Sequence, residues 1–127
     1  YLTYPFVLSW SMLEAMSCEC LVIGSATAPV QEVIEEGANG LLVDFFSPDA
    51  VAAAVVRALS DPAAMAPLRA AARRTVQERY DLRDVCLPAQ IALVDAVAAG
   101  RPPAPHKAPR PAGAAPSPPR VAAVTPA

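Results

Sequence analysis

Few side chains in this sequence could hold a metal ion or form a disulfide. Cys18 and Cys20 are separated by one residue, and Cys86 follows much later. Two cysteines at this spacing are poorly placed for a mutual disulfide, and an odd number cannot all pair. A metal site at Cys18 and Cys20 would need further ligands, and the single histidine, His106, is distant in the chain. We therefore expect three reduced, half-buried cysteines and no metal site.

Ser11 and Glu14 have the spacing of a capping box. In such a box the serine hydroxyl accepts from the backbone N–H three residues on, and the glutamate reaches back to the N–H of the serine. The pattern predicts a short helix from Ser11 to about Ser17, with Glu14 in its first turn. We expect Trp10, just before this helix, to pack in the core.

The elements that must position these residues alternate between strands and helices. Continuous apolar runs predict two buried strands at residues 21–24 and 40–44. Between them, Pro29 opens a helix at residues 30–36, which Gly37 ends. Three further helices are expected at residues 48–59, 61–79 and 82–99. Apolar periodicity points one face of the first two toward the core, and that face comprises Val51, Val55, Val56, Leu59, Leu68, Ala72, Val76 and Tyr80.

This order predicts an α/β fold, a Rossmann-like parallel sheet with flanking helices. Residues 1–99 would form a partial domain, because two strands are too few for a complete sheet. The start at Tyr1, on an apolar run, indicates a fragment of a longer protein. We expect an unpaired strand edge, marginal stability and a tendency to aggregate.

Charge is distributed unevenly along the chain. Residues 1–99 hold 12 acidic groups and 6 arginines, so their net charge is 6 − 12 = −6. Nucleic-acid binding needs a basic face to neutralise phosphates, and no nucleic-acid partner is expected. The sequence has neither a signal peptide nor an apolar run long enough to span a membrane, which favours a cytoplasmic protein.

Residues 100–127 differ in composition from the rest. Nine of the fifteen prolines occur there, with alanines and basic residues. Such a segment buries too little apolar surface to offset the entropy lost on ordering, and we predict a disordered tail. Its proline motifs at residues 102–105 and 116–119 could bind an adaptor protein, although an unconstrained extension is the simpler interpretation.

The segment before the first strand, together with the block that follows it, resembles a known family. The matching stretches are residues 4–16, which include Glu14-Ala15-Met16, residues 21–25, and residues 29–43, which include Glu32-Val33-Ile34 and Gly37-Ala38-Asn39-Gly40-Leu41-Leu42-Val43. Their order and spacing are similar to the donor-site region of the retaining group 1 glycosyltransferases of the GT-B fold. The resemblance covers about residues 1–85.

The resemblance implies a donor site along residues 6–14. In that family two glutamates with seven residues between them contact the transferred sugar and the nucleotide ribose, and backbone amides between them face the sugar and phosphate. Glu14 matches the second glutamate, and Phe6 occupies the first position. Val7, Leu8 and Ser9 would supply the backbone between them. Phe6, Ser9 and Glu19 depart from the family pattern, since a glutamate and two glycines are usual there.

The chemistry of such a site is consistent with these residue types. A carboxylate can accept two ribose hydroxyls in charge-assisted hydrogen bonds, and a helix start favours a diphosphate because its free N–H groups and dipole attract anions. Glu14 could instead serve only as a cap. Glu32 is expected to be a solvated or capping residue.

The resemblance therefore implies the donor-binding half of a retaining, nucleotide-sugar-dependent enzyme of cell-surface polysaccharide synthesis. A saccharide or lipid acceptor would bind a missing N-terminal domain, with peripheral membrane association of the full-length protein, and no metal or other cofactor is expected. Two alternatives stay open: a non-catalytic relic that has lost donor binding, and an interaction module that uses the proline-rich tail.

Overall fold

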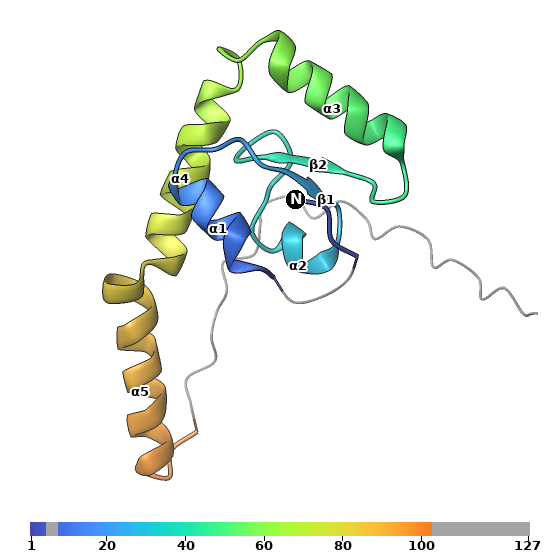
Figure 1. Ribbon diagram of the computed structural model, residues 1–127. Coiled ribbons are helices and arrows are strands. Elements are labelled where there is room, and N and C mark those ends of the chain that lie inside the picture. The colour runs from blue at the N-terminus through green and yellow to red at the C-terminus, as the bar shows by residue number, and fades with distance from the viewer. Residues whose placement is uncertain (5–7, 103–127) are drawn as a thin grey trace, which may run out of the picture.

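The computed structural model describes residues 1–4 and 8–102 of the chain. The elements in chain order are α1 (Trp10–Ser17), β1 (Ile23–Ser25), α2 (Ala28–Gln31), β2 (Leu41–Val43), α3 (Pro48–Ser60), α4 (Ala66–Tyr80), the π-helical turn η1 (Leu82–Cys86) and α5 (Leu87–Ala98). Figure 1 shows a small sheet with helices around it and α5 extending away from it. The predicted α/β fold is confirmed. Residues 103–127, which make up most of the predicted tail, lie outside the described part.

The sheet is parallel, as the alternation of strands and helices predicts. β1 pairs with β2, with Ile23 opposite Leu41 and Ser25 opposite Val43. The start of the chain extends this sheet on the other side of β1. The amino group of Tyr1 donates to the Ile23 carbonyl (2.8 Å), and Ser25 N–H donates to the Tyr1 carbonyl (3.1 Å). Partial burial lowers the pKa of this amino group. Tyr1 therefore lies beside β1 through two backbone hydrogen bonds, although the sheet itself has only the strands β1 and β2 in the described residues.

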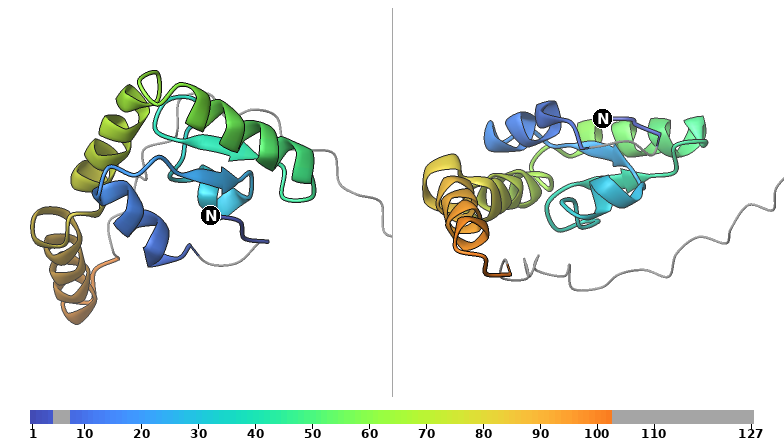
Figure 2. Two further views of the ribbon diagram at one scale, coloured as in Figure 1. Left: turned by 45° about the horizontal axis from the view of Figure 1, so that its top comes forward. Right: turned by 90° about the horizontal axis from the view of Figure 1, so that it is seen from below.

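The two faces of the sheet are covered differently. Gly24 faces α2 and the loop after it, where an added Cβ would lie 2.9 Å from Val30 Cγ1 and 3.4 Å from Ile34 Cδ1. At Gly40 an added Cβ would lie 2.9 Å from Ile34 Cγ2. The opposite face of β2, with Leu41 and Val43 buried, is covered by α3 (Figures 1 and 2). Both glycines thus allow the loop at Ile34 to approach the strands closely.

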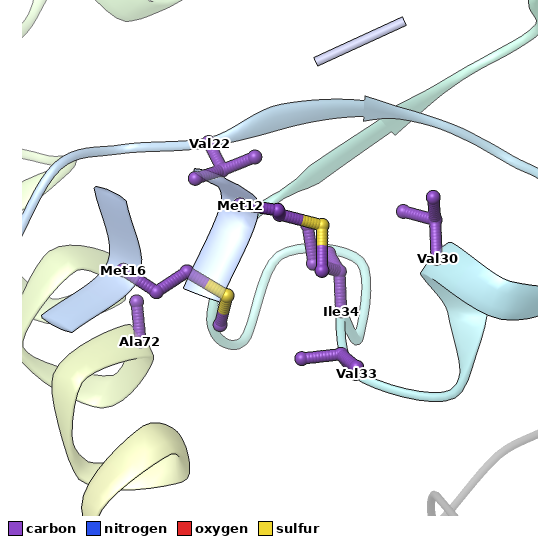
Figure 3. Close-up of a cluster of buried hydrophobic side chains, with 7 residues drawn as sticks. All are labelled: Met12, Met16, Val22, Val30, Val33, Ile34 and Ala72. Carbon is purple, nitrogen blue, oxygen red and sulfur yellow. The ribbon is translucent and has the colours of Figure 1, made fainter. Parts of the chain in front are cut away.

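The core joins α1, the sheet and α4. Figure 3 shows Met12 and Met16 of α1 pointing into it, with Met16 beside Ala72 of α4. The remaining members are Val22, Val30, Val33 and Ile34. Full burial of such side chains contributes about 1.5–3 kcal/mol each, so this cluster is what holds α1 against the sheet.

Asn39 ties the loop after α2 to α4. Its Oδ1 accepts from Glu35 N–H (2.8 Å), and its Nδ2 donates to the Val33 carbonyl (2.9 Å) and to Thr75 Oγ1 (3.0 Å). Asn39 is 7% exposed. One buried amide therefore fixes the turn and its contact with the helix behind it.

Several helix predictions need correction. The helix expected at residues 30–36 is the single turn α2, after which the chain bends to bring Glu36 beside Gly40. The helix expected from residue 61 begins at Ala66, because residues 62–65 form turns. The helix expected at residues 82–99 starts as η1, where Asp81 accepts from two backbone N–H groups.

The apolar face predicted for α3 is mostly in solvent. Val51 is half-buried, whereas Val55, Val56 and Leu59 are exposed. The sheet beneath α3 is too narrow to cover the whole stripe, so the prediction of an inward face is wrong for these three. In α4 the prediction holds better, since Ala72 is fully buried and Leu68, Val76 and Tyr80 are half-buried.

Candidate donor site

The start of α1 is capped by Ser9 and not by Ser11. Ser9 has extended backbone angles, and its hydroxyl accepts from Ser11 N–H (3.3 Å) and contacts the Ser11 hydroxyl (2.8 Å). Ser9 N–H donates to the Tyr1 phenol (2.9 Å). The capping box predicted for Ser11 and Glu14 is therefore wrong. The cap lies two residues earlier because Trp10 already has helical geometry.

This correction changes the interpretation of Glu14. With Ser9 as the cap, Glu14 lies in the second turn, too far along to reach back to the N-terminal N–H groups. Its side chain is exposed, and its carboxylate has no hydrogen-bond or ion-pair partner among the described residues. Glu14 therefore does not cap the helix, and its carboxylate is available to a ligand.

The other predicted site residues are only partly described. Leu8 is half-buried against the core cluster, and Ser9 is half-buried at the helix start. Phe6 and Val7 lie outside the described residues. The structure therefore brings Leu8, Ser9 and the start of α1 together, with Glu14 one turn further along the same helix.

Glu19 occupies a position that favours glycine. Its φ is 59°, a left-handed conformation. Glu19 N–H donates to the Met16 carbonyl (3.1 Å), and Cys20 N–H donates to the Ala15 carbonyl (3.0 Å). This pair of bonds is a Schellman motif, which commonly ends helices with a glycine at the left-handed residue. The departure from glycine noted in the sequence therefore carries backbone strain.

Trp10 and two of the cysteines do not lie where the sequence predicts. Trp10 is 81% exposed at the first position of α1, so the prediction of core packing is wrong. Met12 and Met16 fill the buried side of this short helix, which leaves Trp10 on the outer side. Cys18 and Cys20 are exposed and unbonded, and Cys86 is half-buried and unbonded.

Two further features bear on ligand binding in the described ranges. No group of three or more histidine, cysteine, aspartate or glutamate side chains within residues 1–4 and 8–102 could hold a metal ion. A pocket of about 410 Å³ lies between α1, the residues leading into β1, and α3. Its lining is mainly apolar, with Leu2, Ile23 and Val51 among the residues.

An aromatic group at the carboxyl edge of the sheet was missed from the sequence. The rings of Tyr4, Phe45 and Phe46 contact one another with centroids 5.1–5.7 Å apart. Tyr4 follows the chain start that pairs with β1, and the two phenylalanines follow β2 by two and three residues. The residues after β2 could be expected at this edge, since carboxyl ends of parallel strands meet there. Placing Tyr4 beside them required knowing that the chain start lies along β1.

The fold and sequence both match known glycosyltransferases. Sucrose-phosphate synthase from Thermosynechococcus elongatus superposes with a TM-score of 0.66 at 30% identity, over 72% of this chain and 23% of that chain. HepE from Anabaena, in complex with UDP, superposes with a TM-score of 0.66 at 23% identity, over 76% of this chain and 26% of that chain. The chain thus spans about a quarter of each of these proteins.

Two comparisons of the sequence give different results. No curated protein sequence matches the chain. None of the helices in the described ranges combines the length and apolar character needed to cross a membrane.

The family described as glycosyl transferases group 1 matches residues 7–78, which is more than half of the chain. The match runs from α1 to most of α4. The chain belongs to the group 1 glycosyltransferase family and has part of its Rossmann-like GT-B fold.

Proposed function

We propose that this chain is part of the donor-binding half of a glycosyltransferase that transfers a sugar from a nucleotide sugar to a saccharide or lipid acceptor. The observation that carries the proposal is the free carboxylate of Glu14 on α1, within the stretch that matches the family. The acceptor domain and the rest of the donor site belong to the longer protein.

The donor would bind along the start of α1. Glu14 would accept hydrogen bonds from the ribose hydroxyls, and the backbone from Phe6 to Ser9 would face the sugar and diphosphate. The support is electrostatic and geometric. A free carboxylate forms charge-assisted hydrogen bonds worth about 1.5–3 kcal/mol, and an N-terminal helix end favours an anion.

The finer points of the mechanism rest on the family resemblance. We propose transfer with retention at the anomeric carbon, without a metal cofactor, in a cytoplasmic enzyme of cell-surface polysaccharide synthesis that associates peripherally with the membrane. Activity of the longer protein that survives EDTA, with a retained anomeric configuration in the product, is the expected result. Loss of activity in EDTA that Mg²⁺ restores would contradict metal independence.

Glu14→Gln in the longer protein tests the ribose contact. The substitution keeps the size of the side chain and removes its charge, and Glu14 has no capping role to lose. We expect binding of UDP, the nucleotide in the HepE structure, to weaken roughly ten- to hundredfold by calorimetry, with an unchanged unfolding midpoint.

Glu78→Gln is the matched control, because Glu78 is an exposed glutamate on α4. Equal UDP affinity in Glu14→Gln and the unsubstituted protein would show that Glu14 does not contact the nucleotide. Absence of nucleotide binding and transfer in the unsubstituted protein would instead favour the non-catalytic relic.

A further inference from the structure

The outer edge of β2, defined as the side of this strand away from β1, has no neighbouring strand among the described residues. Leu41 N–H donates to the Val22 carbonyl (2.9 Å), and the Val43 carbonyl accepts from the N–H that follows β1 (2.7 Å). Both residues thus direct backbone groups toward β1. Successive residues of a strand direct these groups to opposite sides, so those of Gly40 and Leu42 point to the outer edge.

An open strand edge is a place where another molecule can add a strand. The sequence of this strand favours such pairing, because residues 40–46 read Gly-Leu-Leu-Val-Asp-Phe-Phe, with one charge and no proline. Short apolar segments without proline pair readily with identical segments of other molecules. The occupant that fits the outer edge is therefore β2 of a second copy of this chain.

The outer edge is already occupied from within the chain. Gly37 N–H donates to the Gly40 carbonyl (2.9 Å), in a bridge that sets Glu36 beside Gly40. The next outward donor along the strand, Leu42 N–H, donates to a carboxylate oxygen of Glu36. This side chain is exposed. The turn before β2 therefore covers the start of the outer edge with backbone and the next position with a charged side chain.

We propose that Glu36 closes the outer edge of β2 against strand addition by a second copy of this chain. An added strand would have to displace the carboxylate from Leu42 N–H and cover the charge, and both steps cost free energy. Charged side chains at sheet edges are a common means of avoiding edge-to-edge association. The role is independent of the proposed donor site, because Glu36 lies in the loop after α2 and not on α1.

Hydrogen exchange by NMR on the 127-residue chain, combined with sedimentation velocity, tests the role of Glu36. In dilute solution the Leu42 amide should be protected in the unsubstituted chain and should exchange roughly ten- to hundredfold faster in Glu36→Ala, through loss of one charge-assisted bond. As the concentration rises, Glu36→Ala should self-associate more than the unsubstituted chain. Its Leu42 amide should then regain protection, because a second copy covers it.

Glu35→Ala is the matched control, since Glu35 is the exposed neighbouring glutamate and its side chain has no bond in the described ranges. It removes the same charge and should behave like the unsubstituted chain. Glu36→Gln keeps an oxygen that can accept from Leu42 N–H and should have a smaller effect than alanine. If Glu36→Ala lacks a native circular-dichroism spectrum, faster exchange at Leu42 alone in Glu36→Gln is the expected result.

Three results would overturn the proposal. The first is a Leu42 amide that exchanges at the unprotected rate in the unsubstituted chain. The second is equal self-association of Glu35→Ala and Glu36→Ala, which would assign the effect to net charge. The third is a folded Glu36→Ala variant that self-associates no more than the unsubstituted chain at any concentration, since the edge would then be closed without this carboxylate.

Discussion

At the scale of single residues, helix α1 begins with a hydrogen-bonded cap and is followed by a residue with a strained backbone. The Ser9 hydroxyl accepts from Ser11 N–H and its carbonyl accepts from Met12 N–H, whereas Glu19 holds a left-handed backbone that costs a side-chain-bearing residue about 1–2 kcal/mol. The only compensation in the described ranges is an ion pair with Arg73 at 3.8 Å, in which both side chains are about half exposed. Exposed pairs of this kind stabilise little.

Glu19→Gly should therefore stabilise the chain. The relief of strain exceeds the extra entropy that glycine loses on folding, which is about 0.5–1 kcal/mol. We expect the free energy of unfolding to rise by about 0.5–1 kcal/mol, measured by urea denaturation. Arg73→Ala, which removes only the ion pair, should change it by less than about 0.5 kcal/mol. A less stable glycine variant would show that the ion pair outweighs the strain.

At the scale of elements, Asn39 is the residue on which the loop after α2 depends. Asn39→Ala leaves the buried carbonyl of Val33 and the partly buried N–H of Glu35 without their partners. Each buried group left unsatisfied costs about 1–3 kcal/mol, so we expect a loss of about 2–4 kcal/mol in unfolding free energy.

Two further variants identify which bonds matter. Asn39→Asp keeps the acceptor and loses both donated bonds, so it should destabilise nearly as much as alanine. Thr75→Val removes the bond from Asn39 to α4 and also the bond from the Thr75 hydroxyl to the Ala71 carbonyl (3.0 Å), and it should cost about 1–2 kcal/mol. Equal stability of Asn39→Asp and the unsubstituted chain would mean that the donated bonds contribute nothing.

The sequence predicts the elements better than their ends or their exposed faces. The apolar runs at Leu21 to Gly24 and Gly40 to Val43 predict β1 and β2, because strands buried on both faces need continuous apolar sequence. The hydrogen bonding of Tyr1 to β1 has no such signal, since only the structure shows that the chain start lies beside this strand. The exposure of Trp10 and Leu59 could not be predicted either, because helical periodicity does not tell how wide a sheet lies beneath.

The candidate site, like the fold, could be predicted only in part from the sequence. The resemblance locates α1 and Glu14. The structure then shows that the cap is Ser9, although the capping-box spacing to Glu14 favoured Ser11. Tyr4 and Phe45 could be placed together only once the arrangement of the chain start and the strands was known.

At the scale of the whole molecule, stability resides in the part that joins α1, the sheet and α4. The proline-rich composition of residues 100–127 predicts that they add nothing to it. Their removal should leave the unfolding midpoint of the chain unchanged in a thermal melt. A fall of several degrees would show that the segment packs on the rest. A second deletion, of residues 87–127, also removes α5, and its unfolding midpoint is compared with that of the first.

The placement of α5 implies that the chain opens in stages. Its main packing partner is η1, and Leu87, Ile91, Leu93, Val94 and Val97 are all exposed. A helix without a buried face can open without disturbing the rest, because its opening breaks few tertiary contacts. Backbone amides of α5 should therefore exchange with deuterium much faster than those of β1, which open only with the core. Equal protection of the two would mean that α5 is covered by a second molecule in solution.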